Sequence, residues 1–177
     1  EKLTQKLIDW AEKEPDKLFL ARRNSTEGNW GGVTYAETLQ QVRGIAQYLL
    51  DLHFSEGETI VILSENSIEH ALLALAAVHI GIPYSPISPP YSLVSNDFGK
   101  LKHCLELMTP KVVFAQNGKV YAQALSLAKQ LFPEAKIVTA EDTNEIDFQE
   151  LLNAQPTEAV EAAYSNVNTD TVAKVLF

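Results

Sequence analysis

The fold is decided by Thr59-Ile60-Val61-Ile62-Leu63, a continuous apolar run that contains no charged residue. Such a run is typical of a strand that is covered on both faces, as in a parallel sheet. The residues that follow, Asn66-Ser67-Ile68-Glu69, can cap a helix. Gly81 stands where a left-handed C-terminal cap is needed, and Pro83 prevents continuation of that helix. The stretch therefore predicts a strand and a helix, with a short strand at residues 84–87 after them.

The same alternation continues towards the C-terminus. Buried strands are expected at residues 112–115 and 136–140, and helices at about residues 95–108, 119–132 and 147–153. Because strand and helix alternate repeatedly, the pattern predicts an α/β fold with a parallel sheet, flanking helices and right-handed crossovers. No internal sequence repeat accompanies this alternation.

A helix and a β-hairpin are predicted ahead of the sheet. Residues 3–14 place apolar side chains near one face, and a proline follows them. Two strand-like segments, residues 18–23 and 30–34, flank a stretch rich in turn formers at residues 24–29, which indicates a hairpin. Thr34-Tyr35-Ala36-Glu37 is a capping box that starts the next helix.

The domain organisation follows from these elements. We expect one incomplete domain over residues 1–177, divided into a helix, hairpin and helix at 1–58, α/β repeats at 59–153, a linker at 154–170 and a strand at 171–177. The linker lacks clear periodicity, whereas the last segment is apolar. Ligands of open α/β sheets bind on the loops after the strands, and the loop after this strand lies outside the sequence. The alternative is a short terminal strand that closes a small domain.

Composition and charge exclude several classes of function. The chain has 14 Lys and Arg against 23 Asp and Glu, and its net charge of -9 makes it a poor nucleic-acid binder. No stretch approaches the apolar length of a membrane span, and no secretory signal opens the chain. A single cysteine, Cys104, allows no intrachain disulfide, which fits a cytoplasmic location. Its helical spacing from Leu101, Leu105 and Met108 indicates a core residue rather than a nucleophile.

The usual signs of catalysis and metal binding are missing from the sequence. The spacing of the four histidines matches no known metal-binding motif, and structural or surface roles are favoured for them. The histidines are His53, His70, His79 and His103. There is no Gly-x-Ser-x-Gly elbow and no glycine-rich phosphate loop, because the one close glycine pair, Gly31-Gly32, falls in the hairpin. The acidic residues at 141–147 are interpreted as a solvated turn. No catalytic residue and no metal ligand are therefore expected in this chain.

One segment invites a functional interpretation. Residues 84–92 contain three prolines and two tyrosines directly after a predicted strand. Prolines fix φ and make a stiff loop, and a stiff loop at the carboxyl end of a parallel strand is a plausible ligand wall. The competing interpretation is a rigid crossover that only links the strand to the next helix.

Several spaced segments together resemble the adenylate-forming superfamily, the ANL enzymes. The resembling segments are residues 33–37, 57–67, 74–86 with Gly81 and Pro86, and 170–177. Residues 86–95 and 97–101 resemble the feruloyl-CoA synthase branch in particular. The resemblance covers nearly the whole chain and implies the incomplete N-terminal part of an AMP-binding domain, with residues 171–177 as the strand that leads to an absent nucleotide loop.

The resemblance implies a two-step reaction in the parent enzyme. A carboxylate, such as ferulate or a fatty acid, attacks ATP to give an acyl-adenylate and pyrophosphate, and CoA then displaces AMP to give a thioester. ATP, Mg²⁺ and CoA are the implied cofactors, with Mg²⁺ screening the phosphates. Since the phosphate loop and the later motifs lie outside the sequence, the chain alone is expected to be inactive and to hold no cofactor tightly.

One site can be carried over from the resemblance. Ser88, Pro89, Pro90 and Tyr91 match a position near the CoA entrance of related ligases and are expected to form part of its wall. A chain cut at Phe177 is also expected to expose apolar surface and to self-associate. The alternatives are a flavodoxin-like module that binds a small ligand near residues 86–91, and an interaction domain that meets a basic partner through its acidic surface.

Overall fold

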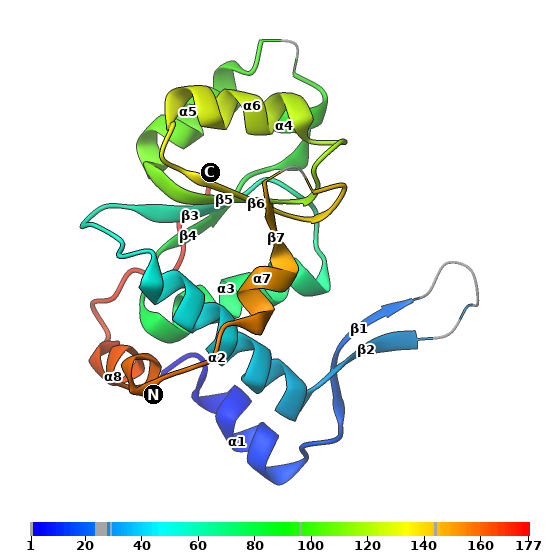
Figure 1. Ribbon diagram of the computed structural model, residues 1–177, viewed down its shortest axis with the longest axis vertical. Coiled ribbons are helices and arrows are strands. Elements are labelled where there is room, and N and C mark those ends of the chain that lie inside the picture. The colour runs from blue at the N-terminus through cyan, green and yellow to red at the C-terminus, as the bar shows by residue number, and fades with distance from the viewer. Residues whose placement is uncertain (1, 24–27, 29, 96, 144) are drawn as a thin grey trace.

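A five-stranded parallel sheet forms the centre of the structure and has helices on both of its faces (Figure 1). The computed structural model describes residues 2–23, 28, 30–95, 97–143 and 145–177. The strand order is β4-β3-β5-β6-β7, with β3 at Thr59–Ile62, β4 at Tyr84–Pro86, β5 at Pro110–Asn117, β6 at Lys136–Glu141 and β7 at Ile146–Asp147. Each neighbouring pair is parallel. The predicted α/β fold with a parallel sheet is confirmed.

Two apolar cores lie on opposite faces of the sheet. The first core is formed with α2 (Tyr35–Asp51), α3 (Ile68–Ile80) and α7 (Phe148–Asn153), and the second with α5 (Gly99–Met108) and α6 (Ala122–Leu131). Ile60 and Ile62 enter the first core, whereas Val61 and Leu63 enter the second. This is the alternation of side chains along a strand. It explains why residues 60–63 are all apolar. Cys104 is buried in the second core, as predicted.

The N-terminal elements agree with the sequence pattern. Helix α1 spans Gln5–Lys13, and β1 (Leu18–Arg23) pairs antiparallel with β2 (Trp30–Thr34). Apart from Gly28, the predicted turn at residues 24–29 lies outside the described residues. At the start of α2, the Glu37 backbone N–H donates to Thr34 Oγ1 at 3.2 Å, and the Thr34 N–H donates to Glu37 Oε2 at 2.8 Å. The predicted capping box is therefore confirmed.

The proline-rich segment after β4 is a short helix rather than the predicted stiff loop. Helix α4 spans Pro89–Leu93, with two prolines in its first two positions. Proline is tolerated there because the first helical N–H groups have no partner within the helix. The predicted helix at residues 95–108 begins only at Gly99. The crossover from β4 to β5 thus contains two helices where one was expected.

The C-terminal segment corrects two further predictions. The expected linker at 154–170 contains helix α8, Glu158–Asn166, whose N-cap Thr157 accepts a hydrogen bond from the Ala159 N–H. The expected strand at 171–177 makes one parallel bridge, between Lys174 and Tyr84. This segment has little apolar periodicity of its own. It is helical because of its N-cap and because α8 packs on α2 and α3.

His79 joins α3 to both ends of the chain. Its side chain is fully buried, its Nδ1 lies 2.9 Å from Thr4 Oγ1, and its ring stacks on Tyr164 of α8 with centroids 4.5 Å apart. The Tyr164 hydroxyl donates to Gln5 Oε1 at 2.7 Å. The start of α1 and the helix α8 are therefore held against the same residue of α3.

Gly81 should be intolerant of a side chain. It has φ of 77° and caps α3 in the left-handed conformation, and an added Cβ would lie 3.2 Å from side-chain atoms of both Thr171 and Val167. Gly81→Ala is expected to lower the free energy of unfolding by about 1–2 kcal/mol in urea titrations. Gly99→Ala is the control, because an added Cβ there meets nothing nearer than 3.6 Å. Equal losses in the two variants would contradict the capping role of Gly81.

Candidate functional site

The carboxyl edge of the parallel sheet is where open α/β folds bind ligands. The residues predicted to form the CoA wall lie at this edge, directly after β4. Ser88 is the N-cap residue of α4, and its carbonyl accepts the Tyr91 N–H at 2.9 Å. Tyr91 is half-buried against the second core, and Lys100 Nζ lies 5.3 Å from the centroid of its ring. Pro89 and Pro90 fix the first turn of α4, so the four residues form one rigid, partly exposed unit.

The topological switch point of the sheet lies between β3 and β5. The chain leaves β3 towards α3 on the first core, whereas it leaves β5 towards α6 on the second. Ligands of doubly wound sheets bind in the crevice that such a divergence creates. Here Tyr121, which is 5% exposed, lies at this point and packs in the second core. Burial raises the pKa of Tyr121. A buried tyrosine of the second core therefore borders the switch point.

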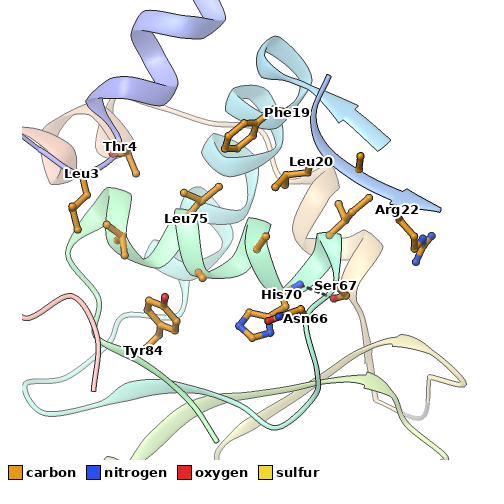
Figure 2. Close-up of a pocket in the computed structure, with 15 residues that line it drawn as sticks. Leu3, Thr4, Phe19, Leu20, Arg22, Asn66, Ser67, His70, Leu75 and Tyr84 are labelled. Atoms are coloured by element: carbon orange, nitrogen blue, oxygen red, sulfur yellow. Dashed lines mark hydrogen bonds between the residues drawn. The ribbon is translucent and has the colours of Figure 1, made fainter. Parts of the chain in front are cut away.

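A larger opening lies over α3, next to β1 and to Tyr84 of β4. This α3 groove has a volume of about 700 Å³ and is bounded by α3, β1, Tyr84 and the residues before α1, as Figure 2 shows. Its lining is Leu3, Thr4, Phe19, Leu20, Ala21, Arg22, Asn66, Ser67, Ile68, His70, Ala71, Ala74, Leu75, Val78 and Tyr84. Most of these side chains are apolar, and the polar groups gather near the N-terminus of α3 (Figure 2).

His70 stands at the polar end of this groove. Its Nδ1 lies 3.1 Å from the Glu65 carbonyl oxygen. Burial lowers the pKa of His70, and the positive charge of Lys174 acts in the same direction. His70 and His79 lie on the same helix, as predicted, and each has a structural contact rather than a metal-ligand geometry. Among the described residues, no three His, Cys, Asp or Glu side chains are placed to hold a metal ion.

A second hollow, of about 620 Å³, lies on the other side of the hairpin. It is lined by Arg22 and Arg23 of β1, by Glu69 and by Glu141 at the end of β6. The opposite charges of these side chains balance, and the hollow therefore presents no excess charge to a ligand. Within the described part of the chain, Glu69 Oε2 and Gln41 Oε1 are buried and lack a hydrogen-bond partner.

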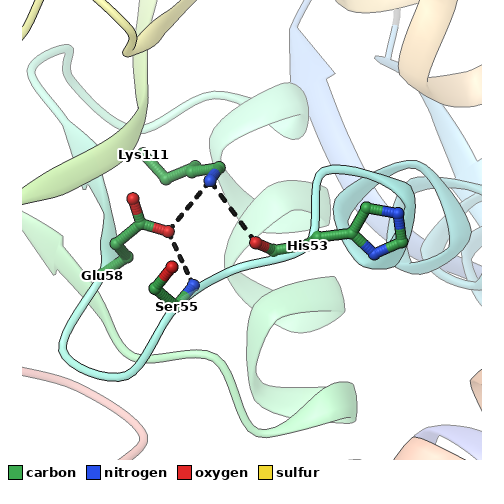
Figure 3. A network of polar contacts seen from close by, with 4 residues as sticks. All are labelled: His53, Ser55, Glu58 and Lys111. Atoms are coloured by element: carbon green, nitrogen blue, oxygen red, sulfur yellow. Dashed lines mark hydrogen bonds and ion pairs between the residues drawn. The ribbon is translucent and has the colours of Figure 1, made fainter.

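A polar network closes the opposite, amino edge of the sheet. Lys111 Nζ contacts Glu58 Oε2 at 3.0 Å and the His53 carbonyl at 3.4 Å, and the Ser55 N–H donates to Glu58 at 2.7 Å (Figure 3). Burial would raise the pKa of Glu58, but the hydrogen bonds from Ser55 and Lys111 and the Lys111 charge lower it overall. The network joins the turn after α2 to β5, and its place at the amino edge argues for a structural role.

Removing Lys111 should raise the pKa of Glu58. Lys111→Met keeps the apolar stem and removes the ammonium group that contacts the carboxylate. We expect the Glu58 side-chain carboxyl signal to titrate at higher pH in this variant when followed by NMR. Lys102→Met is the control, because Lys102 pairs with Glu106 on α5 and not with Glu58. An unchanged Glu58 titration in Lys111→Met would contradict the network.

Comparison with known families decides the identity of this fold. Residues 7–177 match the family described as AMP-binding enzyme. The chain belongs to the AMP-binding enzyme family. The match spans the hairpin, the whole parallel sheet and the C-terminal segment. A search among curated proteins finds no match to the chain.

Solved structures of similar fold include several ligases. Acetoacetyl-CoA synthetase from Streptomyces lividans superposes with a TM-score of 0.75 at 20% identity, over 97% of this chain and 27% of that one. A benzoate CoA ligase from Burkholderia xenovorans LB400 gives 0.72 at 16% identity, over 98% and 32%. A fatty acyl-adenylate ligase from L. pneumophila, solved with acyl adenylate and pyrophosphate, gives 0.67 at 18% identity, over 98% and 27%. This AMP-binding chain therefore spans about a third or less of the length of these three relatives.

The sequence predicts the position of residues 88–91 in the fold but not the α3 groove. Ser88, Pro89, Pro90 and Tyr91 lie directly after β4, and their role in a CoA wall stays a prediction. The α3 groove was not predicted. Its signal was available, because the sequence of α3 is apolar on all sides apart from Glu69, His70 and His79. Of the described helices, none combines the length and apolarity needed to cross a bilayer.

Proposed function

We propose that this chain forms the N-terminal part of an ATP-dependent, AMP-forming carboxylate–CoA ligase. The observation that carries the proposal is the family match over residues 7–177, together with the likeness of the fold to ligases that act on acyl groups. In such an enzyme a substrate carboxylate attacks the α-phosphorus of ATP and pyrophosphate leaves. The CoA thiol then attacks the carbonyl carbon, and AMP leaves as the thioester forms.

The chain contributes scaffold to this reaction rather than reacting groups. Its parallel sheet would hold the elements that surround the nucleotide, and its own sequence has no glycine-rich loop to cradle phosphates. Backbone N–H groups and Mg²⁺ would supply the electrostatic stabilisation of the phosphates in the complete enzyme. We therefore propose that the 177 residues alone catalyse neither half-reaction.

Residues 88–91 would form part of the wall on the CoA side. Two consecutive prolines at the start of α4 hold this wall in one conformation, which reduces the entropy lost when a ligand binds. Tyr91 is half-buried and offers a flat apolar ring edge, with the Lys100 ammonium nearby. A cation beside an aromatic ring suits a ligand that carries both phosphates and an apolar chain, as CoA does. The acid would be aromatic and ferulate-like, as the resemblance of residues 86–101 implies.

The assignment is tested first on the gene. A Thr/Ser/Gly-rich run that leads to Lys, encoded directly after Phe177, would support the ligase proposal, and a stop codon there would contradict it. The product of the open reading frame is then assayed for ATP–pyrophosphate exchange with ferulate, benzoate and a fatty acid. Exchange that depends on one of these acids is the expected result. The isolated 177-residue chain serves as the control and should give none.

The role of Tyr91 is tested in the same protein. Tyr91→Ala should raise the KM for CoA by about tenfold, a loss of about 1.4 kcal/mol in binding, while the ATP–pyrophosphate exchange rate stays unchanged. Tyr48→Ala is the matched control, since Tyr48 lies on α2 and packs against the first core. Equal effects on the two half-reactions would contradict a specific role of Tyr91 on the CoA side.

The flavodoxin-like binding module gains no support from the geometry. Such a module would bind its ligand near residues 86–91, and none of these residues lines the α3 groove or the second hollow. The ligase proposal is therefore the one the observations favour.

A further inference from the structure

Asn117 and Gly118 lie where β5 ends, and this pair of residues is chemically labile. Asn117 is the only asparagine of the sequence that precedes a glycine. The backbone nitrogen of a following glycine can attack Cγ of an asparagine side chain, because no side chain on the glycine hinders the approach. The attack closes a five-membered succinimide ring and releases ammonia. Water then opens the ring to aspartate or isoaspartate.

The fold requires both residues of this pair. A Cβ added to Gly118 would overlap the carbonyl oxygen of Asp142, so the close approach of the two backbones admits only glycine. The side-chain oxygen of Asn117 accepts the N–H groups of Lys119 and Val120, both at 3.0 Å, and satisfies two backbone donors ahead of α6. The labile dipeptide is therefore a consequence of how the chain turns from β5 towards α6.

The native fold keeps the reacting atoms of the pair apart. Asn117 is the last residue of β5 and pairs with Glu141 of β6, so its backbone is extended. An extended residue directs its side chain away from the next backbone nitrogen, whereas the succinimide ring joins the two. The Gly118 nitrogen is also engaged, since it is buried and its N–H donates to the Glu141 carbonyl oxygen at 2.8 Å.

The leaving group of the reaction is held by two carboxylates. Asn117 Nδ2 donates to Asp142 Oδ2 at 2.9 Å and to Glu141 Oε2 at 3.3 Å. With its nitrogen and its oxygen both hydrogen-bonded, the amide cannot rotate towards Gly118 unless these contacts break. Ring closure therefore requires that the end of the β5–β6 ladder opens.

We propose that Asn117-Gly118 is a deamidation site that the native fold holds inactive and that local opening of the β5–β6 ladder makes reactive. In the open state the Gly118 nitrogen loses its proton to solvent base and bonds to Cγ, and Nδ2 leaves with that proton as ammonia. Water adds to Cγ to give aspartate, or to the backbone carbonyl carbon to give isoaspartate. The net reaction consumes water and releases ammonia. The inference does not rest on the ligase proposal.

The product of the reaction cannot restore the native contacts. A carboxylate at residue 117 only accepts hydrogen bonds, and it would face the Glu141 and Asp142 carboxylates to which the amide donates. Isoaspartate also lengthens the backbone by one carbon atom and removes from it the Asn117 carbonyl, which accepts the Tyr121 N–H at 3.2 Å. Both products favour the open ladder, so deamidation at this pair is a lasting record that the fold has opened.

The test measures deamidation in the full product of the open reading frame, folded and unfolded in guanidinium chloride, in mildly alkaline buffer. A synthetic peptide of residues 113–122, followed in both solutions, gives the intrinsic rate of the pair and corrects for the denaturant. Peptide mapping by mass spectrometry detects the acid that replaces the amide at residue 117. We expect the folded protein to react at least about tenfold more slowly than the unfolded protein, because the ladder must open first.

Matched variants separate the hydrogen bonds of the amide from general mobility of the turn after β6. Asp142→Gly removes an acceptor of Nδ2 and suits the φ of 47° at this position, so the folded protein should deamidate about threefold faster. Glu145→Gly makes the same change before β7, where Glu145 pairs with Lys129, and should alter the rate less than about twofold. Asn117→Gln would need a six-membered ring and should abolish the signal.

The consequence for the fold is tested with Asn117→Asp, which imitates one product. Its thermal midpoint should lie about 2 °C or more below that of the wild type. A midpoint equal to that of the wild type would contradict the charge argument. Equal deamidation rates in the folded and unfolded wild type would overturn the proposal, and so would an unfolded protein that stays unmodified while the peptide reacts. These rates decide the question even if Asn117→Asp does not fold.

Discussion

Replacing Phe114 by alanine lowers the free energy of unfolding by about 3–5 kcal/mol. Phe114 is fully buried in β5, where it pairs with Ile62 of β3 on one side and with Val138 of β6 on the other. Its ring lies 5.4 Å from that of Phe148 on α7. Alanine leaves a cavity in the middle of the first core, and close-packed neighbours relax only partly into it.

Urea denaturation at neutral pH measures this loss. Since a domain is stable by about 5–15 kcal/mol, Phe114→Ala removes a large share of the total. Leu107→Ala is the matched control, because Leu107 is 61% exposed on α5 and its truncation should change stability by less than about 0.5 kcal/mol. Similar losses in both variants would show that β5 is not at the centre of the fold.

Acidification should destabilise the protein through His79. Burial lowers the pKa of this histidine to about 4; the negative charge of Glu161 opposes that shift, and the positive charges of Arg43 and Lys2 add to it. Within the described structure, Nε2 is buried without a partner, so a proton added there would be an unsatisfied charge. The unfolded chain, with a histidine pKa of about 6.5, binds this proton more readily.

The sign of the pH effect follows from proton linkage. Between pH 6.5 and 4 the unfolded state holds more protons than the folded state, so stability is complete above the unfolded pKa and falls as the pH drops through this window. The loss contributed by His79 reaches about 3 kcal/mol near pH 4 and then levels off. His79→Asn removes this contribution, while the carboxylates elsewhere titrate as before.

Denaturant titrations at pH 7 and pH 4.5 test this prediction. The wild type should lose more stability between the two pH values than His79→Asn does. His103→Asn, which replaces an exposed histidine on α5, is the control and should behave as the wild type does. Identical losses in the wild type and in His79→Asn would contradict a buried neutral histidine.

Much of the fold could be predicted because a strand that is buried on both faces has a continuous apolar sequence. The run from Ile60 to Leu63 must be apolar at every position, since its side chains enter two cores alternately. The helix ends were predictable for a similar reason. Gly81 and the Thr34 capping box satisfy backbone groups through local chemistry that does not depend on the rest of the chain.

Helix α8 was missed because most of its order comes from distant residues. Val160 is its one buried residue, so no apolar stripe marks it. The Thr157 N–H donates to Gln47 Oε1 at 2.9 Å, Glu161 pairs with Arg43 at 3.0 Å, and Tyr164 stacks on His79. These partners lie on α2 and α3, more than eighty residues earlier in the sequence. A periodicity argument considers only neighbouring residues and cannot detect them.

The predicted strand at 171–177 does not form beyond one bridge, and its backbone hydrogen bonds to β4 show why. Tyr84 donates its N–H to the Ala173 carbonyl at 3.3 Å and accepts the Val175 N–H at 3.0 Å. The next donor on β4 in this ladder would be residue 86, which is proline and has no N–H. The ladder therefore stops after one bridge, although the segment itself is apolar enough to be a strand.

The candidate sites were predictable only in part. The proline-rich segment identified the end of β4, because prolines at the end of a strand are visible in the sequence. The α3 groove depends on how β1 and Tyr84 are placed around α3, and that placement is tertiary.

The contacts between Thr4, Gln5, His79 and Tyr164 also fix an order of events during synthesis. The first turn of α1 gains its hydrogen bond to the Tyr164 hydroxyl, 159 residues away, only after α8 has left the ribosome. At about 5–20 residues per second, the ribosome needs roughly 10–30 s to cover that distance. During this interval α1 can already pack on α2, but its first turn lacks the contact with α8. A nascent chain stalled before Tyr164 should therefore retain a protease-sensitive N-terminus that the finished chain has lost.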